Sequence, residues 1–207
     1  MKKDLESIDL SKLHQPVIGI DEVGRGCLAG PVTAAAVILS NEKKYSFYPD
    51  SKKISEEQRE LLSKEIYSIH TVGLGWAQVE EIDRVNILQA TFLAMKRALS
   101  HLPFKTGTLL IDGRDRIPGL DLWHQVPVIK GDQKVRAISA ASIVAKVARD
   151  QFMKQLANEV VGYGFEKHKG YGTAFHRQKI QELGPSAWHR QTFGGVKEYV
   201  EKLSVSL

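Results

Sequence analysis

Four carboxylates stand where strand-like apolar runs end, each close to glycines or basic residues: Asp21, Glu22, Asp112 and Asp132. A buried carboxylate is unfavourable unless a partner compensates its charge. Mg²⁺ and Mn²⁺ prefer oxygen ligands, and Mg²⁺ keeps much of its water, so a few carboxylates can hold such ions. Two divalent ions about 3.5–4 Å apart can activate water and stabilise the leaving oxygen of a phosphodiester. The four acids therefore predict a metal site suited to phosphodiester cleavage.

A structural role competes with metal binding to a different degree at each acid. Asp21 and Asp112 end the apolar runs VIGI and LLI, where an unpaired carboxylate needs compensation. Asp132, in a Lys-Gly-Asp segment, also suits a turn or a helix cap. Glu22 also suits a solvated strand end. Because neighbours on a regular strand point to opposite faces, Glu22 shares a site with Asp21 only if the strand ends there or if its backbone carbonyl is the ligand.

A glycine-rich turn, Gly24-Arg25-Gly26, follows the acid pair directly. With Gly30 it approaches a dinucleotide-binding fingerprint, and an oxidoreductase is therefore an alternative hypothesis. That fingerprint requires a helix to open within the glycines, whereas residues 31–39 have the pattern of a strand. We interpret the segment as a tight turn whose backbone amides and Arg25 contact a sugar-phosphate.

Composition is that of a globular protein, with 43% hydrophobic and 26% charged residues in 207 residues, and we expect one domain over 1–207. The single cysteine, Cys27, excludes a disulfide framework and leaves too few thiols for a structural zinc site. The N-terminus has no apolar stretch of signal-peptide length, and no run is long enough to span a bilayer. We therefore expect a cytoplasmic protein without membrane contact.

The net charge of +5 is a mild excess, but the basic residues are unevenly distributed. Residues 129–154 hold six cations around two acids and would attract phosphate, although a solvated helix face is the competing interpretation. The six cations are Lys130, Lys134, Arg136, Lys146, Arg149 and Lys154, and the acids are Asp132 and Asp150. A non-catalytic module that binds duplexes through this basic surface is a further hypothesis.

The elements that must position these residues follow from apolar periodicity and turn signals. We expect strands at 16–22, 31–39, 69–79, 108–112 and 123–130, the last at a sheet edge because it contains Pro127. Ser55 and Gln58 form a capping box at the start of one helix. Further helices are expected at 80–99, 136–157 and near 174–183. The order β-β-α-β-α-β-β-α with a helical tail indicates an α/β fold.

Seven segments together resemble the ribonuclease HII family, in its motif order and over about residues 17–195. They are IDEVGRG (20–26), DSKKIS (50–55), EIDRVNIL (81–88), IDG (111–113), KGD (130–132), AASIVAKVARD (140–150) and HKGYGT (168–173). The resemblance implies a ribonuclease H-like fold, with a mixed five-stranded sheet flanked by helices. It also implies a C-terminal helical, substrate-binding extension at 162–207.

The resemblance implies an endonuclease that hydrolyses RNA in RNA/DNA hybrids and cuts 5′ of ribonucleotides embedded in duplex DNA, leaving a 3′-hydroxyl and a 5′-phosphate. Two Mg²⁺ or Mn²⁺ ions would be held by the family's four acids, here Asp21, Glu22, Asp112 and Asp132. Asp150 is expected to be structural. No protein nucleophile is implied, and close helix packing explains Ser139 and Ser142. We expect a monomer.

The resemblance also implies which residues bind the substrate. The glycine-arginine-glycine turn would contact the ribose 2′-hydroxyl, the group that distinguishes RNA from DNA. Tyr171 would stack on the sugar of the following deoxynucleotide. The complete implied substrate-binding set is Gly24, Arg25, Gly26, Lys52, Lys53, Lys169 and Tyr171, in which the three lysines would contact the nucleic-acid backbone.

Overall fold

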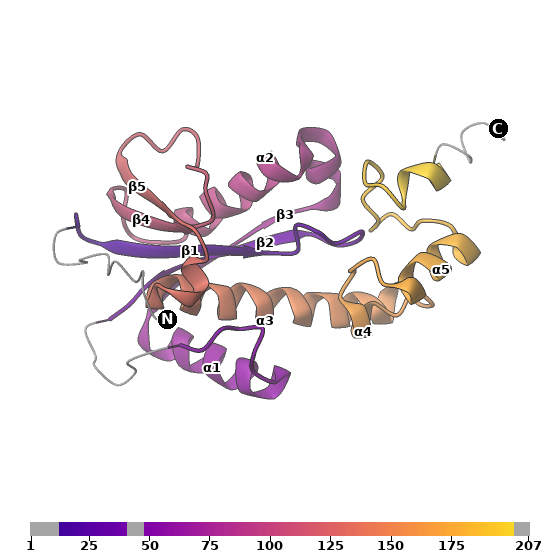
Figure 1. Ribbon diagram of the computed structural model, residues 1–207, viewed down its shortest axis with the longest axis horizontal. Helices are drawn as coiled ribbons and strands as arrows, with labels where there is room; N and C mark the ends of the chain where they lie inside the picture. Colours follow the sequence, from indigo (N-terminus) through magenta and orange to yellow (C-terminus); the bar gives the residue numbers. More distant parts are fainter. Residues whose placement is uncertain (1–12, 41–47, 201–207) are drawn as a thin grey trace, which may run out of the picture.

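The computed structural model describes residues 13–40 and 48–200 (Figure 1). The N-terminal segment discussed above and the last residues of the expected 162–207 extension lie outside this range. Within it, no helix is both long enough and apolar enough to cross a membrane.

A mixed five-stranded sheet forms the centre, with strand order β3-β2-β1-β4-β5. Its strands are β1 (Val17–Val23), β2 (Val32–Ile38), β3 (Thr71–Ala77), β4 (Gly107–Asp112) and β5 (Trp123–Val128). The first three strands pair antiparallel, whereas β4 runs parallel to β1 and β5 parallel to β4. The strand that contains Pro127 lies at an edge, where its missing amide hydrogen costs no ladder bond.

The parallel pairing of β1 with β4 brings two candidate ligands to the same level. Ile20 lies opposite Ile111 in the register, so Asp21 and Asp112 follow together where the two strands reach their carboxyl ends. Two acids separated by ninety-one positions in the chain thereby become neighbours. Ligand sites form at such carboxyl ends in open α/β sheets.

Helices cover both faces of the sheet (Figure 1). On one face lies α2 (Val79–Ser100), and on the other lies α3 (Arg136–Glu159) with α1 (Glu56–Ile69) packed against it. The alternation of β2 follows this division, since Ala34 and Ala36 join the core under α2 whereas Ala35 and Val37 join the core under α3. Each face of the strand is thus apolar.

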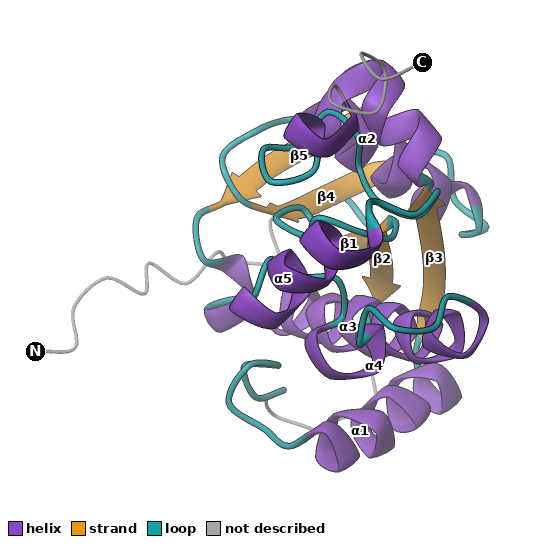
Figure 2. Cartoon of the chain, turned by 90° about the vertical axis from the view of Figure 1, so that its right-hand side faces the viewer, coloured by secondary structure: helices purple, strands orange, loops and turns teal. Residues whose placement is uncertain are grey.

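Beyond the end of the sheet lie the short helix α4 (Phe165–His168) and α5 (Ala174–Leu183), nearest the viewer in Figure 2. A one-turn 3-10 helix, η2 (Gly131–Gln133), precedes α3. Sequence periodicity did not predict α4 or η2, because each is too short to show a repeat. The five strands, the four longer helices and the capping box of α1, in which Ser55 Oγ accepts from Gln58 N, confirm the predictions.

Most boundaries shift by one or two residues, and two differences from expectation affect the argument. First, β1 runs one residue past Glu22, to Val23, which pairs with Thr33 of β2. Second, the helix expected at 80–99 is broken in backbone conformation at Asn86, whose φ is 68°. The Asn86 side chain accepts hydrogen bonds from the amides of Leu88 and Gln89, at 3.0 and 3.2 Å, and so caps the second half of α2.

Glycines let the helices approach the strands closely. A Cβ built on Gly19 of β1 would lie 2.2 Å from the backbone carbon of Ala137 in α3. On the opposite face, a Cβ on Gly75 of β3 would lie 2.1 Å from the carbonyl oxygen of Ala94 in α2. The approach of α3 matters for function, because α3 begins beside η2 and the strand end that carries Asp21.

We expect Gly19→Ala to lower the free energy of unfolding by about 1–3 kcal/mol, because backbone atoms of α3 must move to admit the methyl group. Urea titration followed by circular dichroism measures this change. Gly194→Ala is the matched control, since its nearest contact would be Glu198 Oε1 at 3.9 Å. Equal stability of both variants would contradict the packing argument.

Candidate functional site

Asp21 and Asp112 are held by backbone amides at the carboxyl ends of their strands. Asp21 is 5% exposed, and its Oδ1 accepts a hydrogen bond from the amide of Glu22 at 2.7 Å. Asp112 Oδ1 accepts from the amide of Gly131 at 2.6 Å. Charged acceptors make stronger hydrogen bonds than neutral ones, so these contacts fix both carboxylates firmly.

The same bond to Gly131 brings Asp132 into the group. Lys130 adopts a left-handed conformation, with φ 56° and ψ 44°, and turns the chain sharply from β5 into η2. A Cβ on Gly131 would lie 2.5 Å from Ile138 Cδ1, so a larger residue there would have to displace the end of the Ile138 side chain. Asp132 is 5% exposed. Asp132 therefore lies in a turn shortly before α3, as the competing interpretation also expected, but it is buried there and its charge acts on Asp112.

Glu22 differs from the other three acids. Because β1 continues to Val23, the strand does not end at Glu22, and the side chains of Asp21 and Glu22 leave the pleat on opposite faces. The expectation of a strand end at this position was wrong. The Glu22 carboxylate instead accepts from Arg25 Nη1 at 3.3 Å. Of the two routes considered for Glu22, this geometry favours its backbone carbonyl.

Burial and mutual repulsion disturb the carboxylates. Burial raises the pKa of Asp21 well above its ordinary value, and the nearby charges of Glu22 and Asp112 raise it further. Burial also raises the pKa of Glu22, and repulsion from Asp112 adds to this rise. Burial raises the pKa of Asp112 as well, and there the added repulsion comes from Asp132. Clustered acids with raised pKa values mark a place where added positive charge is favourable.

Two cations partly supply that charge. Lys52 Nζ lies 3.4 Å from Asp132 Oδ2, and Arg25 forms the pair with Glu22. Burial alone would lower the pKa of Lys52, but the attraction of Asp132 and Asp21 raises it. Over residues 13–40 and 48–200, no three His, Cys, Asp or Glu side chains already surround one point as an ion would require.

The donor set nevertheless suits hard divalent ions. It consists of carboxylate and carbonyl oxygens without sulfur or imidazole, which matches the preference of Mg²⁺ and Mn²⁺. Among the residues that the structure describes, the ion pairs of Lys52 and Arg25 reach only two of the four acids, Asp132 and Glu22. The residues present therefore fit a divalent-metal centre.

The glycine turn lies between two C-terminal segments. Cys27 forms a bridge with Tyr171 and Ala29 with His189, and the amide of Leu28 donates to the carbonyl of Gly170 at 2.8 Å. The turn leads into β2, which is antiparallel to β1, rather than into a helix. This connection excludes the dinucleotide fingerprint.

The loop that carries Tyr171 is fixed by its backbone and leaves the ring accessible. Tyr171 is 41% exposed, while its carbonyl accepts from the amide of Thr173 at 2.8 Å and lies 2.9 Å from His176 Nδ1. Lys169 is buried, with Nζ on the carbonyl of Glu166, whereas the side chains of Lys52 and Lys53 are 75% and 76% exposed. Only the latter two lysines present their ammonium groups to solvent.

The basic residues within 129–154 are less available to an external phosphate than the sequence indicated, because several of them are paired or buried. Lys146 binds Asp150 at 2.6 Å, which supports a structural role for Asp150. Lys154 pairs with Glu56 and Glu60. Arg149 is completely buried beside the glycine turn, as is Arg190. Arg149 was expected among the cations that would attract phosphate, and its complete burial makes that expectation wrong, whereas Arg190 was not considered. An arginine inside the alanine-rich run of α3 was a usable signal for Arg149, but Arg190 had none.

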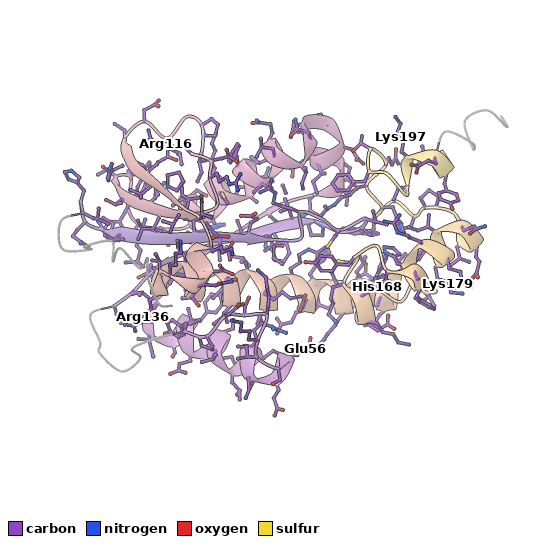
Figure 3. The ribbon with its side chains drawn as sticks, viewed as in Figure 1. Glu56, Arg116, Arg136, His168, Lys179 and Lys197 are labelled. Atoms are coloured by element: carbon purple, nitrogen blue, oxygen red, sulfur yellow. The ribbon has the colours of Figure 1, made fainter. Side chains whose placement is uncertain are left out.

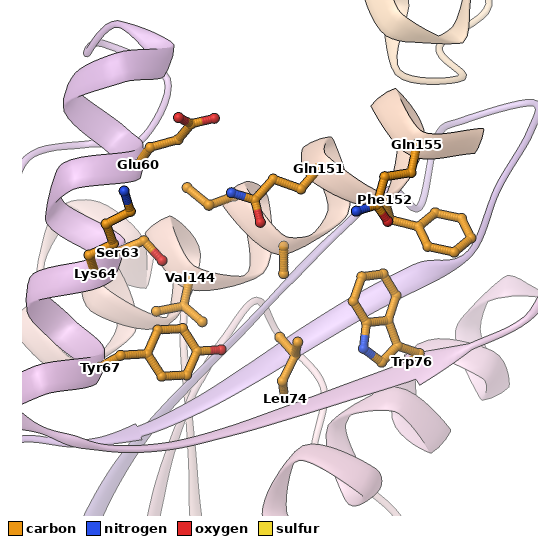
Figure 4. Close-up of a pocket in the computed structure, with 12 residues that line it drawn as sticks. Glu60, Ser63, Lys64, Tyr67, Leu74, Trp76, Val144, Gln151, Phe152 and Gln155 are labelled. Atoms are coloured by element: carbon orange, nitrogen blue, oxygen red, sulfur yellow. The ribbon is translucent and has the colours of Figure 1, made fainter. Parts of the chain in front are cut away.

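A groove of about 470 Å³ lies elsewhere, between α1, α3 and β3 (Figure 4). Trp76, Leu74 and Phe152 line its apolar part, and Glu60 and Lys64 its polar part. None of the candidate site residues lines it. In Figure 3, Arg136 marks the start of α3, beside η2, and His168 lies toward the opposite end of the molecule, beyond the sheet. A duplex polymer requires an open surface rather than an enclosed small-molecule cavity.

The chain is similar to known proteins over nearly its full length. The family model for ribonuclease HII matches residues 18–195. A ribonuclease HII from Zymomonas mobilis is 44% identical over 207 residues, covering 98% of this chain and 95% of the relative. The crystal structure of ribonuclease H2 from Pyrococcus horikoshii has a TM-score of 0.73 at 23% identity, covering 91% of this chain and 98% of its own. Bst-RNase HIII in complex with Mn²⁺ has a TM-score of 0.66 at 20% identity, covering 90% and 69%. These structures share the ribonuclease H-like fold.

We expect Asp21→Asn to stabilise the protein at neutral pH without divalent ions. The raised pKa of Asp21 means that its ionised form opposes folding, so the gain is full above that pKa. The gain disappears as the pH falls below the ordinary value of 3.8, where the carboxyl is protonated in both states. Thermal unfolding from pH 3 to 8 measures it, and each kcal/mol raises Tm by about 2–4 °C.

Asp121→Asn, which removes an exposed carboxylate, is the control and should change Tm little at any pH. An Asp21→Asn variant that is less stable than the wild type at pH 7 would contradict the electrostatic account.

Proposed function

The chain belongs to the ribonuclease HII family and is a metal-dependent endoribonuclease that hydrolyses the RNA strand of RNA/DNA hybrids, and we propose that it also cuts 5′ of ribonucleotides embedded in duplex DNA. The observation that carries the proposal is the continuity of the candidate metal centre with the glycine turn. Asp21 ends the buried part of β1, and the turn follows within five residues. A phosphate at the acids would therefore lie next to the group that reads its ribose.

Two divalent ions, Mg²⁺ or Mn²⁺, would be held by the carboxylates of Asp21, Asp112 and Asp132 and by the backbone carbonyl of Glu22. Such ions supply a Lewis acid for the phosphodiester and activate water at neutral pH. The raised pKa values of Asp21 and Asp112 support this set, because each acid gains from an added positive charge. The products would carry a 3′-hydroxyl and a 5′-phosphate.

The protein's own groups would bind and orient the substrate. Lys52, beside Asp132, is placed to contact a phosphate near the acids, and Lys53 lies next to it on the same loop. Lys169 would need to leave the carbonyl of Glu166 to reach the nucleic acid. Gly24, Arg25 and Gly26 would contact the 2′-hydroxyl, and the accessible ring of Tyr171 would stack on the next sugar.

No serine nucleophile is needed. Ser139 Oγ donates to the carbonyl of Tyr48 at 2.9 Å, and Ser142 Oγ lies 3.0 Å from Ser51 Oγ. The Ser139 hydroxyl therefore serves packing, whereas the Ser142 hydroxyl also bonds the carboxyl of Asp21 and so acts to lower the pKa of that group. We further propose one catalytic domain over 1–207, with 162–207 as its substrate-binding extension, acting as a monomer in the cytoplasm.

A duplex-binding module without catalysis is the second hypothesis. Strand scission on addition of Mg²⁺ would decide against it.

We expect Asp112→Asn to lower kcat on a duplex with one ribonucleotide by roughly 100-fold or more, as when one electrostatic group of an active site is removed. The dissociation constant for the duplex should change little, because phosphate and ribose contacts lie elsewhere. Gel-resolved cleavage and fluorescence anisotropy measure the two quantities, with Asp121→Asn as the control. Unchanged turnover in Asp112→Asn would refute its place in the metal centre.

Arg25→Ala should weaken discrimination between a duplex with one ribonucleotide and the same all-DNA duplex by about 10- to 100-fold, the contribution of one charge-assisted hydrogen bond. The measurement is the ratio of the two dissociation constants in the Asp112→Asn background, where the duplex stays uncut. Arg116→Ala, which changes an exposed arginine of the β4–β5 loop (Figure 3), is the control. Intact discrimination in Arg25→Ala would refute the proposed role of the Arg25 side chain.

A further inference from the structure

Two completely buried arginines direct their guanidinium groups at the backbone around the glycine turn. Arg190 Nη2 donates to the carbonyl oxygens of Gly24 and Gly30, at 2.7 and 2.8 Å, and its Nη1 donates to the carbonyl of Arg25 at 2.8 Å. Arg149 donates at 2.9–3.1 Å to three further carbonyls, those of Ala29, Pro31 and Lys169. Every hydrogen bond from these two guanidinium groups is to a main-chain carbonyl.

Neither arginine forms an ion pair with an acid among the described residues. A buried charge without a counterion is unfavourable, and apolar residues of similar volume often stabilise a fold better. Burial lowers the pKa of Arg190 to about 10, which still leaves it protonated at neutral pH. Carbonyl dipoles, the ring of Phe193 at 5.0 Å from Arg190 Cζ, and the more distant charge of Asp83 support the charge of Arg190.

The bonds from Arg190 determine how the turn presents its amides. In a planar trans peptide, the carbonyl oxygen and the next amide hydrogen point in opposite directions. Holding the carbonyls of Gly24 and Arg25 toward Arg190 therefore turns the amides of Arg25 and Gly26 away from it. Neither amide donates a hydrogen bond to any residue that the structure describes. Two neighbouring free donors of this kind form a concavity that suits an oxygen ligand.

The segment that carries Arg190 is also anchored without its side chain. Asp83 of α2 accepts from the amides of Gln191 and Thr192, at 2.9 and 3.0 Å. The amide of Arg190 itself donates to the carbonyl of Leu28 at 2.8 Å. The guanidinium is thus not the only link between the C-terminal part and the turn.

We propose that Arg190 is a positioning residue for ribonucleotide recognition, which orients the peptide groups of Gly24 and Arg25 so that the amides of Arg25 and Gly26 face the ribose 2′-hydroxyl. Arg149 supports it from the other side, because it binds the carbonyls of Ala29 and of Lys169 and so links the turn to the Tyr171 loop. The inference rests on the proposed role of the turn in contacting the 2′-hydroxyl.

The test compares Arg190→Lys, which keeps the charge but loses the planar fork, with Arg190→Met, which removes the charge. A positioning role predicts a higher KM on the ribonucleotide duplex and a discrimination ratio reduced by roughly 10- to 100-fold, as expected for a displacement near 1 Å. The Mg²⁺ concentration for half-maximal rate should stay at the wild-type value.

Arg97→Lys is the matched control, because Arg97 also donates to a backbone carbonyl, that of Trp76 at 2.7 Å, and binds Glu81, but touches no site segment. It should leave discrimination unchanged. A purely structural role for Arg190 would reduce the folded fraction, lowering the apparent kcat with KM and discrimination unchanged, and that result would overturn the proposal.

Two measurements separate the proposed role of the turn from the role of Arg190. Arg25→Ala keeps the amide of residue 25 and tests only its side chain, whereas the chemical shifts of the Arg25 and Gly26 amides test the turn itself. If those shifts respond equally to both duplexes, the proposed role of the turn fails, and the role of Arg190 fails with it. If Arg25→Ala loses discrimination and Arg190→Lys does not, only the positioning inference is wrong.

A measurement on a protein with Arg190 intact covers the case in which neither Arg190 variant folds. In ¹⁵N-labelled Asp112→Asn protein, the amides of Arg25 and Gly26 should shift on adding the ribonucleotide duplex and shift much less with the all-DNA duplex. Equal shifts with both duplexes would overturn the proposal.

Discussion

Mutual repulsion among carboxylates buried at one end of a parallel strand pair is the constraint on which the rest of this structure depends. The β1–β4 register sets Asp21 beside Asp112, and the amide of Gly131 holds Asp112 next to Asp132. Burial and repulsion then raise the pKa values of Asp21 and Asp112. Lys52 supplies positive charge beside these acids, and the amides of Glu22 and Gly131 supply hydrogen-bond donors.

The candidate metal centre and the glycine turn are held by different interactions. Sheet register positions the acids, and glycines allow α3 to approach closely enough to seat η2. The turn at 24–26 lies outside any strand and is held instead by hydrogen bonds from a buried guanidinium group to its carbonyls. A planar fork suits that task better than an ammonium group, because it fixes several carbonyl directions at once.

The sequence was most informative where a pattern is local. Strands appeared as β-branched runs, the α1 cap as Ser55 with Gln58, and Asp21 and Asp112 as acids that end apolar strands. It was less informative where a contact joins distant positions, since the partners of Arg190 lie 160–166 residues away. The break at Asn86 was hidden as well, because its flanking apolar spacing is helical. The extent of β1 past Glu22 followed from its pairing with β2.

The long separation between the turn and Arg190 has a consequence during synthesis. All four acids have been added to the growing chain once residue 132 is made, but the turn beside them lacks its guanidinium support until residue 190 follows. At about 5–20 residues per second, that interval lasts roughly 3–12 s. A nascent or prematurely terminated chain can therefore contain the candidate metal-binding acids before Arg190 is present to hold the carbonyls of the turn.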